Sequence, residues 1–337
     1  THPDVLRIAT EKVRQWMRDQ PAATIFSVSQ NDWHNYCTCK ECSRVMEEEG
    51  SPMGPYLRFV NAIAAEIEKE FPDKVVDTLA YQFTRKPPRK TVPRSNVVVR
   101  LCSIECCFTH PLATRESMDK ENAAFARDLR EWSGISKRLY IWDYVTNFHH
   151  YLAPYPNLDS VTANLKFFAR HNVKGVYSQG NYQSPGEFSE LRAWLLAKLL
   201  WNPEADAKTL QDDFLAGYYG KGAAGVRTYI DLLHKKGREE NLHLGKTPKM
   251  NSPHLEAGIL QQCDTILDEA EAAAESEDVR FRVQTARMPV WFARANRLPE
   301  ADPEKKRLDE RWRDVARKME VTHTHEGSAD FEQKKRR

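Results

Sequence analysis

Three carboxylates stand directly after apolar segments of this sequence, at Asp32, Glu105 and Asp143. An acidic group at the end of a buried strand costs free energy unless it is paired or hydrated, so its position carries information. Two such groups facing each other across a pocket can cleave a glycosidic bond. One protonates the leaving oxygen, and the other acts on the opposite side of the sugar. Each carboxylate, taken singly, could instead cap a helix or pair with an arginine.

Asn31 and Asp32 form the most informative pair. Adjacent side chains on a strand point to opposite faces, but at a strand end both can turn into a pocket. Enzymes that act on 2-acetamido sugars often use the substrate acetamide as the nucleophile. They then need one residue to orient the acetamide and another to protonate the leaving group. We expect Asn31 to orient the acetamide and Asp32 to act as the acid.

Aromatic and amide side chains gather at the same strand ends. Flat rings suit the C–H face of a sugar, although about half of these rings are expected to be core or rim packing. There is no glycine-rich phosphate loop, which argues against nucleotide binding. The expected sugar-binding residues are Gln30, Tyr81, Trp142, Asp143, Tyr144, Gln179 and Asn181.

Three cysteines follow the first strand end at metal-ligand or disulfide spacing: Cys37, Cys39 and Cys42. A structural zinc takes four ligands, and His34, Cys106 or Cys107 could supply the fourth. A metal or disulfide is the first expectation, buried thiols the second and a catalytic thiol the third. The chain has 7 cysteines, an odd number, so they cannot all pair with one another.

The elements that must position these residues alternate between strand and helix. This alternation predicts a parallel sheet with crossover helices. Polar residues at every strand end favour a (β/α) TIM-type barrel over a doubly wound sheet. A closed barrel needs eight strands, so the pattern predicts the last five βα units of one. The expected strands are 23–29, 75–83, 96–104, 138–143 and 174–179, and the expected helices are 3–19, 54–71, 119–132, 158–171 and 187–200.

No strand pattern follows residue 203. We therefore divide the chain into a partial barrel region, 1–203, that carries catalysis and a helical C-terminal region, 204–337. Glu187, in the first turn of the expected helix 187–200, is expected to complement the helix dipole, although it could instead reach back into the pocket. The expected C-terminal helices are 205–219, 223–240, 255–275, 279–297 and 303–321.

The composition suits a soluble globular enzyme of 337 residues, with 41% hydrophobic residues, 29% charged residues and a net charge of +2. The basic residues are scattered, which gives no case for nucleic acid as a partner. No apolar run reaches the roughly 18 residues of a membrane span. The chain begins at Thr1, without a methionine or leader, and reads as starting inside a fold. The oligomeric state cannot be read from the sequence.

Several stretches between about residues 25 and 220 resemble domain of unknown function 4838 (DUF4838), later grouped as glycoside hydrolase family 163. Members include endo-β-N-acetylglucosaminidases that cut the chitobiose core of complex N-glycans. The resemblance implies retaining, acetamide-assisted hydrolysis of a glycan substrate with no required cofactor, in an extracellular or periplasmic location. The matching stretches are 29–32, 35–39 with Cys42, 50–52, 80–88, 100–106, 142–144, and 179–180 with 197–201.

The resemblance also bears on the roles of single residues. Asp32 is the first choice for the general acid, because related barrel glycosidases carry theirs at the fourth strand, and Glu105 is the second. Asp143 and Tyr144 would hold sugar hydroxyls or the acetamide. Family members carry an upstream domain and earlier barrel strands. We therefore expect this chain to be a fragment that exposes two sheet edges and is inactive alone.

Two further readings stay open. One is a glycosidase of another specificity, either an exo-hexosaminidase or an α-glucuronidase-like enzyme. The α-glucuronidase-like class needs a cationic clamp for the substrate carboxylate, which Arg85, Lys86 and Arg100 could supply. Arg100 lies within a strand, so we expect it to pair internally. The other reading is a carbohydrate-binding protein without turnover.

Overall fold

The computed structural model describes residues 2–112 and 119–331. The chain folds into two compact units whose segments interleave along the sequence. The first comprises Thr1–Glu105, Lys120–Asp143 and Phe167–Ser178. The second comprises Cys106–Asp119, Tyr144–Lys166 and Gln179–Arg337. This division follows chain packing and does not test the catalytic boundary at residue 203, which stays a prediction.

The first unit is built on a five-stranded sheet in the order β1-β2-β3-β4-β5, as the alternation predicted. The strand pairings from β1 to β4 are all parallel. A parallel sheet whose neighbours follow chain order is the arrangement of a partial (β/α) barrel. β1 is shorter than predicted, because its register with β2 covers only three positions. The strands are β1 (Ile25–Ser27), β2 (Val75–Ala80), β3 (Val97–Cys102), β4 (Leu139–Tyr144) and β5 (Val173–Gln179).

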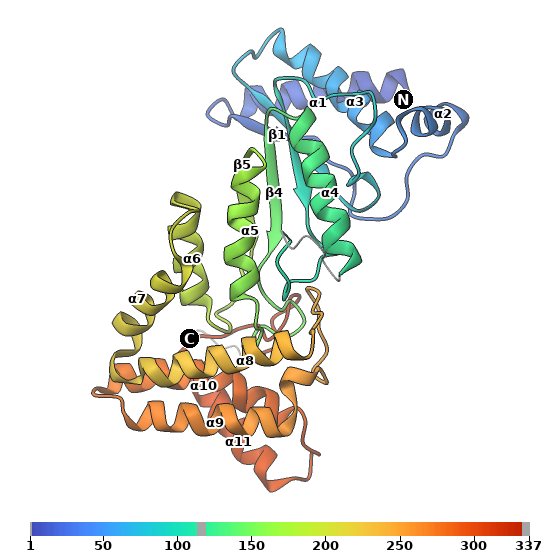
Figure 1. The fold of residues 1–337 in the computed structure, drawn as a ribbon. Coiled ribbons are helices and arrows are strands. Elements are labelled where there is room, and N and C mark those ends of the chain that lie inside the picture. The colour runs from blue at the N-terminus through green and yellow to red at the C-terminus, as the bar shows by residue number, and fades with distance from the viewer. Residues whose placement is uncertain (1, 113–118, 332–337) are drawn as a thin grey trace. The chain divides into compact units, whose positions relative to one another are not determined.

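The predicted helices that follow these strands are confirmed to within a few residues, and Figure 1 shows α4 running along the sheet. The sequence did not predict α2 (Lys40–Glu49). Its first residues were read only as part of the cysteine cluster, and it ends where Gly50 adopts φ 65°. The other helices are α1 (Pro3–Asp19), α3 (Met53–Glu68), α4 (Lys120–Ile135) and α5 (Leu158–Arg170).

The sheet has two chemically different faces. Tyr56 of α3 donates its hydroxyl to the carbonyl of Val28 at 2.9 Å, and Thr78 of β2 donates to the same carbonyl at 2.8 Å. Thr78 therefore faces α3, and we name this helix-covered side the outer face. Side chains alternate along a strand, so Asp77 lies on the opposite, inner face. The registers Asp77–Val98 and Leu79–Arg100 extend the inner face across β3.

The helices predicted after residue 203 are confirmed (Figure 1), and they all lie in the second unit. Its core includes fully buried Tyr229, Leu260 and Val283. A Cβ added at Gly225 would lie 2.6 Å from the Cβ of Ala270, so glycine allows α8 and α9 to approach closely. The helices are α6 (Ser189–Trp201), α7 (Ala207–Tyr219), α8 (Ala223–Glu239), α9 (Ala257–Ala272), α10 (Glu277–Ala295) and α11 (Pro303–Lys318).

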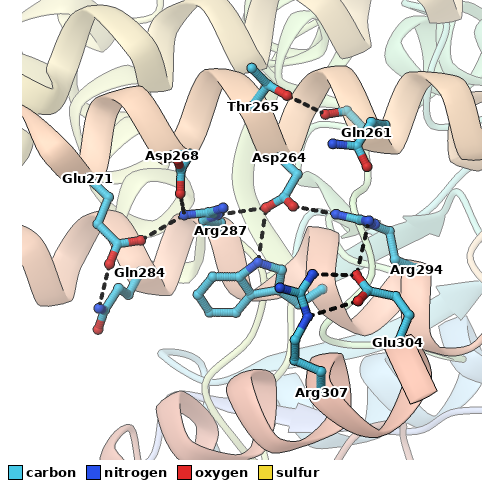
Figure 2. A network of polar contacts seen from close by, with 11 residues as sticks. Gln261, Asp264, Thr265, Asp268, Glu271, Gln284, Arg287, Arg294, Glu304 and Arg307 are labelled. Carbon is cyan, nitrogen blue, oxygen red and sulfur yellow. Dashed lines mark hydrogen bonds and ion pairs between the residues drawn. The ribbon is translucent and has the colours of Figure 1, made fainter.

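An ionic network joins α9 to α10 (Figure 2). Arg287 of α10 contacts three carboxylates of α9: its Nε lies 2.6 Å from Asp264, and its Nη1 lies 2.6 Å from Asp268 and 2.9 Å from Glu271. The indole of Trp291 also donates to Asp264 at 3.0 Å. The Arg287 side chain is only 4% exposed, so these partners compensate a buried charge.

In the described part of the chain, no helix is long and apolar enough to cross a membrane.

Candidate functional site

Asp32 lies beyond the end of β1 and is held by a residue from the end of β2. The hydroxyl of Tyr81 donates to Oδ1 of Asp32 at 2.9 Å. The ring of Tyr81 is buried, whereas Asp32 is exposed to solvent. Burial and the neighbouring carboxylate raise the pKa of Tyr81, so the phenol stays protonated and donates. The structure thus brings together two of the predicted site residues as a rigid donor and a solvent-accessible carboxylate.

Gln30 fixes the segment that carries Asp32. Its amide nitrogen donates to the carbonyl of Tyr81 at 3.1 Å, and its amide oxygen accepts from the hydroxyl of Thr84 at 2.5 Å. Thr84 in turn accepts from the backbone N–H of Tyr81 at 3.1 Å, within a short 3₁₀ turn that follows β2. Both ends of the Gln30 amide therefore hold protein groups. Thr84 was not among the predicted site residues, although it lies within the stretch 80–88 that carries the family resemblance.

An apolar pocket of about 300 Å³ lies beside this segment. Asn31 and Trp33 line it, and both are exposed. Tyr36 also lines it and packs on Phe83, with ring centroids 4.8 Å apart. Aromatic rings around an open pocket are suited to the apolar face of a sugar. Of the predicted catalytic and sugar-binding residues, Gln30 and Asn31 line this pocket, and their action together with Asp32 stays a prediction.

Glu105 belongs to an ion-paired group. Nη1 of Arg85 lies 3.0 Å from Glu105, and Nε of the same guanidinium lies 2.9 Å from Asp128 of α4. Glu121 lies 3.7 Å from Nη2. Arg85 is 12% exposed and Glu105 is 31% exposed, so one carboxylate oxygen is anchored while the group still meets solvent. Because several carboxylates surround Arg85, it has little positive charge left for a substrate carboxylate.

Asp143 lies on the outer face of β4. The registers of Leu101 with Ile141 and of Cys102 with Trp142 place Trp142 on the inner face and the next residue on the outer one. The hydroxyl of Ser103 donates to Oδ1 of Asp143 at 2.6 Å, and Asp143 is only 3% exposed. The structure therefore separates Asp143 from Trp142 by the full thickness of the sheet.

The inner face carries a charged pair, Arg100 and Asp77, of which the sequence analysis identified only Arg100. Nη2 of Arg100 lies 3.0 Å from Asp77, which confirms the expected internal pairing of Arg100. The guanidinium also lies 6.0 Å from the ring centroid of Trp142, whose ring meets Tyr177 edge-on at 4.9 Å. Burial raises the pKa of Asp77 against the opposing charge of Arg100. Asp77 was missed, although an acid inside the apolar run Val75–Ala80 was a readable signal.

Three of the predicted sugar-binding residues lie in the second unit. Tyr144 meets Phe148 edge-on, with centroids 5.8 Å apart, beneath the ammonium group of Lys246. The amide of Gln179 donates to Glu326 at 3.2 Å. The amide of Asn181 donates to the carbonyl of Ser184 at 2.6 Å. Their participation in a site with Asp32 stays a prediction.

The predicted cysteine cluster is assembled: the sulfur atoms of Cys37, Cys39 and Cys42 all lie within 4.8 Å of one another. No disulfide links any of the chain's cysteines, all of which the structure describes. Hydrogen bonds from the Cys42 backbone and from the Cys37 and Cys42 side chains lower the pKa of Cys39 to about 7. His34 is not part of this group, and Cys107 belongs to a different one.

Glu187 differs from its expected role. It precedes α6, which begins at Ser189, and it is buried rather than placed in the first helical turn. Its Oε2 accepts from Arg192 at 2.8 Å. Burial raises the pKa of Glu187, and Arg192 opposes that change. The dipole interpretation was wrong because the arginine one turn into the helix supplies the compensating charge.

Comparison with known proteins places these features in a family. The structure is similar to that of a protein described as a GH138 enzyme targeting pectin rhamnogalacturonan II, with a TM-score of 0.51 and 10% sequence identity. The likeness covers 96% of this chain and 48% of that protein, so this chain spans about half its length. At that identity the likeness shows the fold. No curated protein matches this chain. The family model described as a domain of unknown function, DUF4838, matches residues 1–231, and the chain therefore belongs to the DUF4838 family.

Proposed function

We propose that this protein is a glycoside hydrolase. The observation that carries the proposal is the exposed carboxylate of Asp32, fixed by the Tyr81 hydroxyl at 2.9 Å beside an aromatic pocket. The partial-barrel sheet supports it, because such barrels carry their active sites at the C-terminal strand ends. The structurally similar GH138 enzyme supports the same reaction class.

Asp32 acts as the general acid in this proposal. It meets solvent, and the Tyr81 hydroxyl holds it in one direction, so it is placed to serve a glycosidic oxygen. Glu105 is ion-paired with Arg85, which suits an anion that orients substrate or stabilises positive charge at the anomeric carbon. The proposal thus assigns Asp32 and Glu105 different tasks on the basis of their partners.

The finer proposal is an endo-β-N-acetylglucosaminidase that works with retention. Asn31 precedes the acid in the sequence and lines the aromatic pocket, where it would orient the substrate acetamide. The acetamide carbonyl oxygen attacks the anomeric carbon while Asp32 gives its proton to the leaving oxygen. Water then opens the cyclic intermediate and returns the proton to Asp32, so the reaction consumes one water. The sequence motifs around Asn31 and Asp32 support this specificity.

A uronic-acid-directed glycosidase is the second candidate, and Arg100 favours it. The Nε of Arg100 is buried and has no hydrogen-bond partner among the described residues. The guanidinium lies beside the partly exposed ring of Trp142. The Arg100 side chain as a whole is 24% exposed, so a substrate carboxylate on the inner face would pair with its guanidinium group. Arg100→Lys would then raise KM for uronic-acid substrates only.

To test the proposal, the protein is produced in the form in which its source organism makes it and is incubated with a released biantennary N-glycan. The products are identified by their mass. Cleavage between the two core N-acetylglucosamines is expected. Asp32→Asn should lower kcat by about 10²–10⁴-fold, and Glu105→Gln should lower it as well. Asp278→Asn, in the first turn of α10, serves as the matched control and should leave the rate unchanged. Cleavage of uronic-acid substrates instead would favour the second candidate, and glycan binding without any cleavage would mean a binding protein.

Zinc at Cys37, Cys39 and Cys42 is proposed as a structural support for the segment that carries Asp32. Three sulfurs within 4.8 Å of one another match the donor set of a thiolate zinc site. The lowered pKa of Cys39, about 7, favours the thiolate form that binds a metal. This proposal concerns folding of the loop and leaves the reaction without a required cofactor.

A further inference from the structure

A second cluster of metal-ligating side chains lies in the second unit. Cys107, His110 and His243 bring one ligand atom each within 4.8 Å of one another. The sulfur of Cys107 lies 3.2 Å from Nδ1 of His110. The rings of His110 and His243 have centroids 4.6 Å apart and an interplanar angle of 42°, so they are not stacked flat on each other.

The backbone holds these groups in place independently of any ligand. The N–H of Phe108 donates to the carbonyl of Leu244 at 2.8 Å. The hydroxyl of Thr109 donates to the carbonyl of Leu242. The segment that carries Cys107 and His110 is therefore hydrogen-bonded to the residues directly before and after His243. The Thr109 bond joins two residues that lie 133 positions apart in the sequence. A preorganised site loses little conformational entropy when it binds an ion.

Asp119 orients His243 from the far side of the ring. Nδ1 of His243 donates to Oδ2 of Asp119 at 2.9 Å. The Asp119 side chain is 16% exposed and that of His243 is 39% exposed. A histidine that donates one ring nitrogen to a carboxylate presents the other as a ligand of fixed direction. The carboxylate thus leaves Nε2 of His243 as the ligating atom.

From these contacts, the geometry points to a Zn²⁺ site formed by Cys107, His110 and His243, with Asp119 as the carboxylate that orients His243. One thiolate and two imidazoles form a soft, nitrogen-rich donor set that suits Zn²⁺ better than Mg²⁺ or Ca²⁺. Three protein ligands leave a fourth tetrahedral position for water or another donor.

A substitution at Asn241 can test the site by strengthening metal binding, whereas substitutions of the ligands weaken it. Its side-chain amide lies 3.0 Å from Nε2 of His243, where the ion would bind. An entering ion therefore has to displace this amide. Asn241 adopts φ 46°, a conformation that glycine also tolerates. Replacing Asn241 with glycine removes the competing amide without straining the backbone, and should tighten metal binding.

The proposed metal site is connected to the proposed reaction by its position in the sequence. Cys107 lies two residues after Glu105, so an ion there would fix the segment directly behind that carboxylate. The inference rests on the metal site alone and does not require the proposed function. Failure of catalysis would therefore leave it standing.

Co²⁺ is the probe, because a thiolate in tetrahedral coordination gives it a charge-transfer band. The titration uses the metal-free protein with Cys37→Ser and Cys39→Ser, which removes the other thiolate cluster. About one Co²⁺ per chain should bind, and Zn²⁺ should displace it. His110→Ala and His243→Ala should abolish the band, Asp119→Asn should weaken affinity about 10–100-fold, and Asn241→Gly should tighten it.

His325→Ala is the control and should leave the titration unchanged, since His325 lies outside the cluster and bonds to Asp330. No charge-transfer band in the Cys37→Ser, Cys39→Ser background would overturn the inference. So would a band that persists in His243→Ala. The Asn241→Gly variant distinguishes loss of the metal site from misfolding, because tighter metal binding cannot arise from loss of structure.

Discussion

At the scale of single residues, the environment of Asp32 depends on Tyr81. The Tyr81 hydroxyl holds the Asp32 carboxylate, and Gln30 and Thr84 hold the backbone around Tyr81. An acid catalyst has to keep one direction through the reaction, because proton transfer depends on the donor–acceptor geometry. Tyr81 is therefore a positioning residue in the proposed mechanism.

We predict that Tyr81→Phe lowers kcat by about 10-fold and leaves KM nearly unchanged, because the variant keeps the buried ring and loses only the hydroxyl. Steady-state kinetics on the cleaved glycan measure both constants. Tyr218→Phe, on α7 in the second unit, is the matched control. A rise in KM with constant kcat would show instead that Tyr81 binds substrate.

The sequence predicted the candidate carboxylates but not all of the residues that hold them. Strand ends are visible as apolar runs that stop, so Asp32, Glu105 and Asp143 could all be found. The partners of Glu105 and Asp143 were not visible, because Arg85 and Ser103 reach these carboxylates through turns and register that no local pattern encodes. The outer-face position of Asp143 follows from counting alternation along β4, which requires the register first.

At the scale of elements, the contact of α9 with α10 depends on charge compensation (Figure 2). Arg287 is nearly buried, and Asp264 is only 11% exposed. A buried ion pair adds little net stability, yet removing one partner leaves an uncompensated charge in a poor solvent. Substitution of the arginine should therefore be more costly than its hydrogen bonds suggest.

We predict that Arg287→Met lowers the free energy of unfolding by about 3–5 kcal/mol, measured by urea denaturation. The control is Arg280→Met on the same helix, whose partner Glu277 is 86% exposed. That exposed pair should contribute less than about 1 kcal/mol. Equal effects of the two substitutions would contradict the role given to burial.

At the scale of the whole molecule, the two units differ in the acid sensitivity of their buried groups. In the first unit, burial opposes ionisation of Glu49, but bonds from Thr91, Lys90 and Arg58 lower its pKa to about 2. In the second unit, burial lowers the pKa of His254 to about 4, and its Nε2 hydrogen-bonds the carbonyl of Pro154. Both groups bind a proton less readily when folded than when unfolded.

Stability should therefore decrease in two windows as the pH is lowered. The His254 contribution is complete above pH 6.5 and is lost as pH falls toward about 4. The Glu49 contribution is complete above pH 4.5 and is lost toward about 2. Each amounts to about 3 kcal/mol. Urea denaturation across these pH values should show His254→Gln flattening the upper window and Glu49→Gln the lower one, and an unchanged slope in either variant would refute that assignment.

The fold was predictable where hydrophobic patterning is strong. All five strands and the C-terminal helices follow from apolar runs and helical periodicity in the sequence. The missed helix α2 buries Cys42, Val45 and Glu49 at helical spacing, so a helical pattern was present, but its first residues were read only as part of the cysteine cluster. The interleaving of the two units could not be predicted, because it depends on which chain segments pack together across long sequence separations.

The alternation along β4 limits how this protein can change in length. A one-residue insertion or deletion before Trp142 would send its ring to the helix-covered side and bring the carboxylate of Asp143 toward the inner face. An insertion after Tyr144, where β4 ends, would leave both side chains where they are. Natural variants and engineered chimaeras should therefore accept length changes downstream of the strand and reject them within it.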